Sequence, residues 1–194
     1  MARTQRNKQL RSLHLFICED SKSSKYYMQG LGRAKGINIK AEEADGTSPE
    51  NVLRSAKEKQ KLFKDKRIVQ IYCLFDKDDC NDEKFKKVIT QCQKAGFVEA
   101  ISVPCYEYWL LLHLKKTSQP FKDAQECCET FRAEYNKKFQ TQYTVKQLKA
   151  KADIFNDLKD NLDSALANAD NLELDEASTP YTNMHQVIKR VIGM

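Results

Sequence analysis

The sequence predicts an α/β domain in which a mostly parallel sheet is flanked by helices and followed by a helical C-terminal half. Short apolar runs alternate with amphipathic segments as far as Val103, and only helical patterns follow Pro104. Strand–helix–strand repetition implies parallel strands joined by right-handed crossovers. The 194 residues, 41% of them hydrophobic, suffice for one domain with its own core. We therefore expect a basic arm at residues 1–11, an α/β core at 12–105 and a helical region at 106–194 packed on that core.

The elements of the α/β core are recognised by apolar runs and by the polar turns that end them. The run that begins at Leu13 stops abruptly at Glu19, as expected for a buried strand that meets a polar loop. The helix that opens at Ser48 has a capping residue, then proline, then an acid in its first turn. In order, we expect strands at 13–18, 37–41, 68–75 and 98–103, separated by helices at 23–34, from 48 onward, and from Asn81 or Asp82 to Ala95.

The C-terminal half is expected to contain helices joined by loops. Residues 106–114 are apolar on nearly every side, which predicts a buried helix. The patterns at 122–139 and 144–169 predict two long, charged, amphipathic helices. Residues 171–179 are expected to form a loop. A last helix is indicated by apolar residues at the spacing i, i+3, i+4, i+7, namely Met184, Val187, Ile188 and Val191.

Charge and cysteine content restrict the classes of function. The net charge is +6, and basic residues gather at 3–11 and 57–67. Such clusters attract polyanions, including nucleic acids, although a solvated helix face explains the second cluster equally well. The seven cysteines lack a metal-binding spacing, so we expect reduced packing residues. No apolar run approaches the length of a membrane span and no signal-length segment follows the basic N-terminus, so we expect a cytoplasmic protein without a membrane partner.

Acidic residues follow two of the predicted strands. Glu19 ends the first strand, and Asp76 and Asp78 end the third. The carboxyl ends of parallel strands meet at one edge of a sheet, and residues two apart in an extended chain share a face. If the two strands are neighbours, the three carboxylates converge on one ion. Oxygen-rich clusters select Mg²⁺ or Mn²⁺ and leave positions for water and phosphate, so this pattern indicates phosphodiester chemistry.

Other polar residues near these strands can be interpreted either as structural or as functional residues. Asp79 is more simply a turn or capping residue. Glu107 begins an apolar helix, where it can cap the helix, support a ligand or bind a second metal. His113 ends that helix and is more simply a hydrogen-bonded core residue. Three lysines are candidates for contact with phosphate, although the side chain of the third is expected to point away from the acids: Lys22, Lys25 and Lys77.

Four blocks of sequence resemble a known family. They are Phe-Ile-Cys-Glu at 16–19, Leu-Phe-Asp-Lys-Asp-Asp at 74–79, Ser-Val-Pro-Cys-Tyr-Glu-Tyr-Trp-Leu-Leu-Leu-His at 102–113 and Ser-Thr-Pro-Tyr-Thr-Asn-Met-His at 178–185. The first two are similar to the Toprim domain of topoisomerases, primases and nucleases. The whole set resembles the RloB-like family of bacterial defence proteins, which includes part of an AbiL-type abortive-infection pair. The resemblance implies a Toprim-like, Rossmann-like fold, with Glu19 as catalytic acid and Asp76 and Asp78 as the metal-binding pair.

The expected function is metal-dependent hydrolysis of RNA or DNA in antiviral defence. The family usually has glycine after its first acid, whereas this chain has Asp20. That difference motivates a second hypothesis, a weakly active or inactive nucleic-acid-binding or sensor subunit that works with a partner ATPase. A phosphatase or nucleotide hydrolase is a third. The chain lacks room for the separate domain of a topoisomerase and has no phosphate-binding glycine–lysine loop. Homodimerisation is left open.

Overall fold

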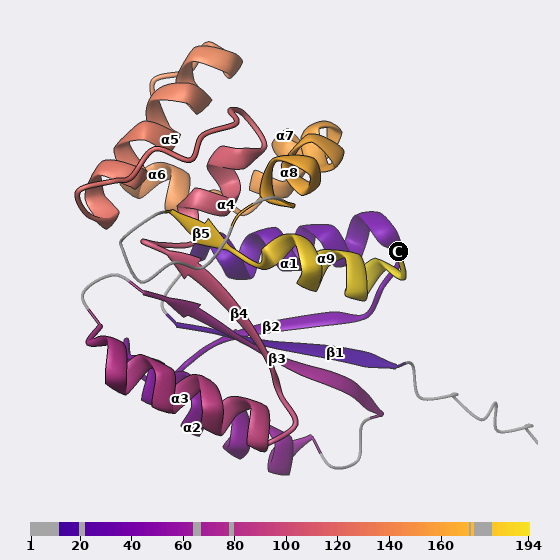
Figure 1. Cartoon of the computed structure of the whole chain (residues 1–194). Coiled ribbons are helices and arrows are strands. Elements are labelled where there is room, and N and C mark those ends of the chain that lie inside the picture. Colours follow the sequence, from indigo (N-terminus) through magenta and orange to yellow (C-terminus); the bar gives the residue numbers. More distant parts are fainter. Residues whose placement is uncertain (1–11, 20–21, 64–66, 78–79, 171, 173–179) are drawn as a thin grey trace, which may run out of the picture.

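A five-stranded sheet forms the centre of the computed structural model, which describes residues 12–19, 22–63, 67–77, 80–170, 172 and 180–194 (Figure 1). The strand order among these residues is β2-β1-β3-β4-β5. The first four strands pair in parallel, and β5 pairs antiparallel with β4. The predicted α/β class with a mostly parallel sheet is therefore confirmed. The strands are β1 (Leu13–Cys18), β2 (Ile39–Glu43), β3 (Ile68–Asp76), β4 (Val98–Val103) and β5 (Tyr181–Thr182).

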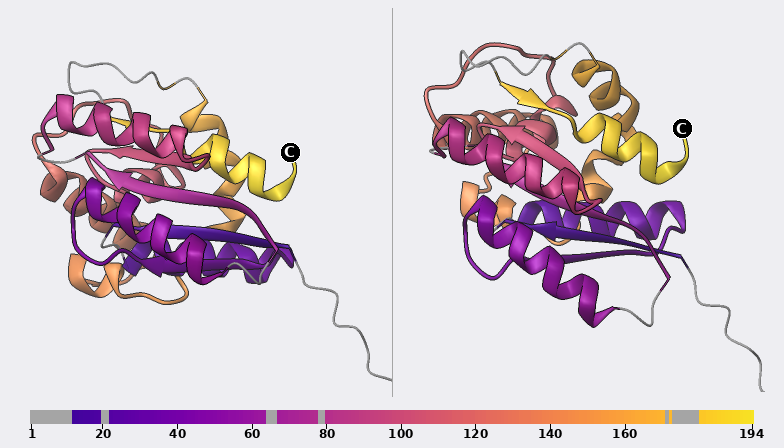
Figure 2. Two further views of the ribbon diagram at one scale, coloured as in Figure 1. Left: turned by 90° about the horizontal axis from the view of Figure 1, so that it is seen from below. Right: turned by 60° about the horizontal axis from the view of Figure 1, so that its bottom comes forward.

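Helices cover both faces of the sheet (Figures 1 and 2). One face carries α2 and α3, and the other carries α1, α9 and the helical C-terminal half. Within the described ranges, no helix combines the length and apolarity that a membrane crossing requires. The helices are α1 (Lys22–Lys35), α2 (Pro49–Leu62), α3 (Asp82–Lys94), α4 (Glu107–Leu112), α5 (Ala124–Phe139), α6 (Val145–Lys149), α7 (Ile154–Leu158), α8 (Leu162–Ala169) and α9 (Met184–Ile192).

Two buried clusters lie on opposite faces of the sheet. Alternate side chains of β1 supply them: Phe16 faces the helical C-terminal half, whereas Ile17 faces α2 and α3. This alternation is the two-residue period of a strand that is buried on both faces. The larger cluster continues from Phe16 and Tyr72 on the sheet to Trp109 in α4, all three of which are fully buried. The α/β part and the helical part thus share one core.

The starts of two core helices follow the sequence signals. Ser48 caps α2, where its hydroxyl accepts a hydrogen bond from the amide of Asn51. Asn81, rather than Asp82, caps α3: its side-chain oxygen accepts from the amides of Glu83 and Lys84. Each cap satisfies amides that have no partner within the helix. The choice between Asn81 and Asp82, which the sequence left open, is thereby settled.

The single long helix predicted at 144–169 is wrong. The chain forms α6, α7, a short 3-10 turn (Lys159–Asn161) and α8 in its place. Leu148 and Ile154 are both buried, but six residues of continuous helix would point them about 120° apart. The break between α6 and α7 lets each short helix bury its own apolar side.

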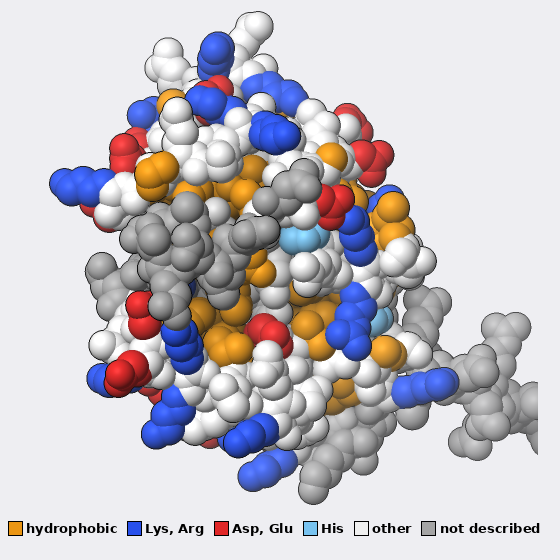
Figure 3. All heavy atoms as spheres, in the orientation of Figure 1, with side chains coloured by type: hydrophobic (Ala, Val, Ile, Leu, Met, Phe, Trp, Pro, Cys, Tyr) orange, Lys and Arg blue, Asp and Glu red, His pale blue; other side chains and the backbone are white. Residues whose placement is uncertain are grey.

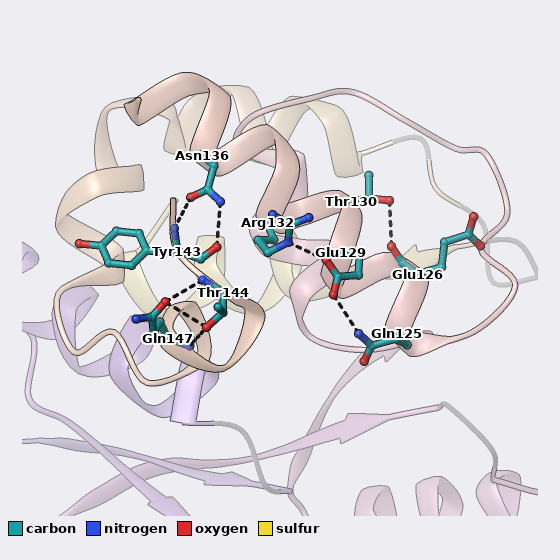
Figure 4. A network of polar contacts seen from close by, with 9 residues as sticks. All are labelled: Gln125, Glu126, Glu129, Thr130, Arg132, Asn136, Tyr143, Thr144 and Gln147. Atoms are coloured by element: carbon teal, nitrogen blue, oxygen red, sulfur yellow. Dashed lines mark hydrogen bonds and ion pairs between the residues drawn. The ribbon is translucent and has the colours of Figure 1, made fainter. Parts of the chain in front are cut away.

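The connection between α5 and α6 is fixed by Asn136 (Figure 4). Its side chain donates to the carbonyl of Tyr143 at 2.8 Å and accepts from the amide of Tyr143 at 3.0 Å. Thr144 then forms a capping box with Gln147 at the start of α6. Gln140, the residue that ends α5, adopts a left-handed conformation with φ of 52°. These contacts determine where α6 begins.

The antiparallel strand β5 was not predicted. Asn183, directly after it, accepts a hydrogen bond from the amide of Ile101 at 2.7 Å and donates to the carbonyl of Glu99 at 3.1 Å. The side chain of Asn183 therefore continues the pairing along β4 where β5 has ended. A two-residue strand after Pro180 has too short a pattern to be recognised in sequence.

At the opposite side of the sheet, β2 carries charged residues. Glu42 forms ion pairs with Lys40 of the same strand and with Lys59 of α2. Glu43 pairs with Lys25 of α1 at 3.2 Å. Among the described strands, β2 has a neighbour on one side alone, namely β1.

Candidate functional site

The carboxyl ends of β1 and β3 lie side by side. Cys18 is in register with Leu74, so Glu19 leaves β1 where Asp76 ends β3. Oε2 of Glu19 accepts a hydrogen bond from the backbone amide of Asp76 at 3.0 Å. Both side chains are partly exposed. Two acids that are 57 positions apart in sequence therefore meet at one edge of the sheet.

Some of the predicted residues cannot be placed. Asp78 and Asp79 lie outside the described residues, as do Asp20 and the basic arm at 1–11. Asp76 is thus the described member of the Asp-x-Asp pair. The convergence of Asp78 on the same position stays a prediction from the two-residue period of an extended chain.

The three candidate lysines have different surroundings. Lys77 pairs with Asp82 of α3 at 2.8 Å, and this contact lowers the pKa of the exposed Asp82 carboxyl. Lys25 pairs with Glu43 at 3.2 Å, whereas Lys22 is exposed at the start of α1. On the face seen in Figure 3, Lys and Arg side chains are spread out with acids among them and do not form one basic patch.

Buried polar groups line the interior beneath the acids. Burial raises the pKa of the Cys18 thiol to about 12, and the charge of Asp76 adds to this effect. Burial likewise raises the pKa of Tyr106, with contributions from Tyr27, Glu107 and Asp76. The Tyr106 hydroxyl has no hydrogen-bond partner among the described residues. These groups are neutral at pH 7, so they add no charge to compete with that of the acids.

His113 is a core residue, as its apolar surroundings in the sequence favoured. It is buried, and its ring nitrogens contact the carbonyl of Trp109 at 3.0 Å and the hydroxyl of Tyr27 at 2.9 Å. A carbonyl only accepts, so Nδ1 carries the proton and Nε2 accepts from Tyr27. Burial lowers the pKa of His113 to about 4, which keeps the ring neutral at pH 7. With both nitrogens engaged, His113 acts through packing and hydrogen bonds.

Glu107 is buried, at 2% exposure, in contacts that the sequence did not indicate. Its Oε1 accepts from the Ser23 hydroxyl at 2.8 Å, and its Oε2 lies 3.7 Å from Nζ of Lys149. The carboxylate therefore joins α1 to α6 across the core, and does not simply cap α4. Ser23 lies in the first turn of α1, only four positions after Glu19, so Glu107 helps to fix the start of that helix.

Two buried thiols accompany Glu107. Sγ of Cys128 lies 3.6 Å from Oε2 of Glu107 and 3.9 Å from Sγ of Cys105. The ligand atoms of the three residues all lie within 4.8 Å of one another, a grouping that could hold a metal ion. Sequence reasoning missed it because Cys105 and Cys128 are 23 positions apart. The one available signal was that Cys105 and Glu107 flank the same residue of the most distinctive sequence block.

The fold and the site together define an α/β protein with paired acids at the carboxyl edge of a parallel sheet. A comparison with protein-family models identifies the family: the model described as RloB-like protein matches residues 14–191, nearly the whole chain. The chain belongs to the RloB-like family. Searches of curated proteins and of solved structures gave no significant match.

Proposed function

We propose that this protein is a Toprim-type, metal-dependent hydrolase of nucleic-acid phosphodiesters. The observation that carries the proposal is the hydrogen bond from the Asp76 amide to the Glu19 carboxylate, at 3.0 Å. It supports the expectation that acids from two adjacent strands act together. Membership in the RloB-like family is consistent with this activity. The biological role that we propose is anti-phage defence of the abortive-infection type, in the cytoplasm.

The donor set suits a hard divalent cation. Glu19 and Asp76 offer carboxylate oxygens at a partly exposed edge, and we propose that Asp78 adds a third. When bound, Mg²⁺ or Mn²⁺ polarises a phosphate and lowers the pKa of a bound water. In this arrangement Asp76 and Asp78 would hold the ion. Glu19 either contributes a ligand or transfers a proton, and its hydrogen bond with the Asp76 amide orients its carboxylate.

Cleavage assays test the proposal directly. Purified protein is incubated with labelled single- and double-stranded RNA and DNA in Mg²⁺ or Mn²⁺. We expect divalent-dependent cleavage that falls about a hundredfold or more in Glu19→Gln and in Asp76→Asn, because each change removes a charged ligand. Glu83→Gln is the matched control, since it removes one exposed carboxylate at the start of α3 and should leave cleavage unchanged. Equal activity in all the variants would exclude these acids as the reaction centre.

The second candidate is a nucleic-acid-binding or sensor subunit that works with a partner ATPase. It is motivated by Asp20, which stands directly after Glu19 where the family usually has glycine. Measuring binding by fluorescence anisotropy alongside cleavage separates the two. Binding without cleavage under any divalent ion would support the sensor. Release of phosphate from mononucleotides, with intact strands, would instead indicate a nucleotide hydrolase.

A further inference from the structure

We infer that Cys105, Glu107 and Cys128 form a zinc site that is separate from the proposed Mg²⁺ or Mn²⁺ site. The three residues are buried; Cys105 and Glu107 are two positions apart, and Cys128 comes from the following helix. Cys105 precedes α4, Glu107 begins α4 and Cys128 lies in the first half of α5. Thiolates are soft ligands that zinc binds readily and magnesium does not. A zinc ion here would join α4 to α5 at the base of the helical half.

The distances fit tetrahedral coordination before any rearrangement. With ligands at about 2.3 Å for sulfur and about 2.0 Å for oxygen, zinc sets two sulfurs about 3.8 Å apart and a sulfur and an oxygen about 3.5 Å apart. The Cys105–Cys128 sulfur distance is 3.9 Å, and the distance from the Cys128 sulfur to Glu107 Oε2 is 3.6 Å. Two of the three distances between the ligand atoms thus match tetrahedral zinc, and the third, between Cys105 and Glu107, is within 4.8 Å. A fourth corner is left for water.

Charge balance also fits. Two thiolates and one carboxylate carry three negative charges, and zinc supplies two positive ones. Lys149, whose Nζ lies 3.7 Å from Glu107 Oε2, supplies the remaining positive charge. A neutral assembly avoids the cost of an unpaired charge in a buried place. The Lys149 side chain is 44% exposed, so the group lies just beneath the surface, where an ion can enter.

The carboxylate of Glu107 is also held by a hydrogen bond, as the carboxylates that bind metals usually are. Its other carboxylate oxygen, Oε1, accepts the hydrogen bond from Ser23 at 2.8 Å. Hydrogen bonds of this kind orient a ligating carboxylate and leave the opposite oxygen directed at the ion. With Ser23 holding Oε1, the oxygen that faces Cys128 is Oε2. Each atom of the carboxylate thus has its own role.

Metal content provides the test. The full chain is purified after expression with added zinc, and metal is measured by plasma mass spectrometry. We expect about one zinc per chain, and its loss in Cys105→Ser and in Cys128→Ser. Cys92→Ser is the matched control, because Cys92 is a buried thiol beside that of Cys73 on the opposite face of the sheet, and the metal-ligand grouping found among the described residues does not include it. Replacement of zinc by Co²⁺ should add a thiolate-to-cobalt absorption band to the wild type and to Cys92→Ser alone.

Two further measurements guard against misfolded variants. The first is circular dichroism, which checks that each serine variant is folded. The second is the zinc affinity of Lys149→Met, a variant that leaves all three ligands in place. Loss of the lysine's positive charge should weaken this affinity about tenfold. Affinity is read by competition with a chromogenic chelator. Absence of zinc from the wild type, with no cobalt band, would overturn the inference and leave a Glu107–Lys149 ion pair beside two reduced thiols. Loss of zinc that is equal in Cys92→Ser would overturn it as well.

Discussion

At the scale of single residues, the best-defined polar group is His113. Its ring is held between the Trp109 carbonyl and the Tyr27 hydroxyl and is fully buried. Burial keeps this imidazole neutral in the folded protein, whereas in the unfolded chain it can take up a proton at mildly acidic pH. Protonation therefore favours the unfolded chain. The stability of the protein should therefore depend on pH through this residue.

We predict that the free energy of unfolding decreases as the pH falls from 6.5 to 4. The unfolded His113 takes up a proton near its ordinary pKa of 6.5, whereas burial lowers the pKa of the folded residue to about 4. The contribution is therefore complete above pH 6.5 and is lost toward pH 4, by about 3 kcal/mol in total. Urea unfolding at several pH values measures it. His113→Gln should flatten this dependence, whereas His14→Gln, at a half-buried ring, should keep most of it; a profile unchanged by His113→Gln would contradict the assignment.

Residue-level prediction from sequence succeeded for residues whose location follows from the end of a strand in the predicted sheet. Glu19 and Asp76 follow strands that proved to be neighbours, so their proximity follows from the parallel order. The partners of Glu107 could not be foreseen in this way. Ser23, Cys128 and Lys149 reach it from three helices, and only the packing of those helices brings them together.

At the scale of elements, the end of α5 offers a direct test of local structure. Gln140 has φ of 52° and ψ of 46°, a left-handed conformation that disfavours a side chain with a Cβ. We predict that Gln140→Gly raises the free energy of unfolding by about 0.5–1 kcal/mol. Thermal or urea unfolding measures the change. Lys137→Gly, within the same helix, should instead lower stability by about 1 kcal/mol, and a loss in both variants would show that Gln140 is not strained.

Element boundaries were predictable wherever a cap or a turn residue was present. Ser48 and Asn81 both begin helices that start within a residue of the expected position. The break within 144–169 was missed because the charged residues there suit a continuous helix locally. The decisive constraint is that Leu148 and Ile154 must both reach the core, and this depends on neighbours that no local pattern specifies.

At the scale of the whole molecule, one core cluster spans the sheet and the helical half. Trp109, the single tryptophan, lies inside this cluster and is fully buried. We predict that urea unfolding followed by tryptophan fluorescence and by far-ultraviolet circular dichroism gives coincident transitions, because the two halves cannot lose their shared packing separately. A fluorescence transition at lower urea than the dichroism transition would show that the helical half unfolds independently.

The fold class was predictable because alternating strands and helices restrict a chain to few topologies. The antiparallel addition of β5 was not, since Tyr181 and Thr182 reach β4 from far along the sequence. The proximity of Cys105 and Cys128 likewise could not be predicted, because it joins residues that are 23 positions apart. Both depend on how the C-terminal half folds back over the sheet.

The charges of β2 have a consequence for self-association. An edge strand such as β2 offers unpaired backbone groups to any other extended chain, and charged side chains on it discourage the addition of another strand. Lys40, Glu42 and Glu43 alternate with, or follow, the apolar positions of this strand, and the ion pairs of both glutamates would have to be desolvated or broken. Lateral addition of another strand, including fibril-like growth, is thus opposed at this edge of the sheet.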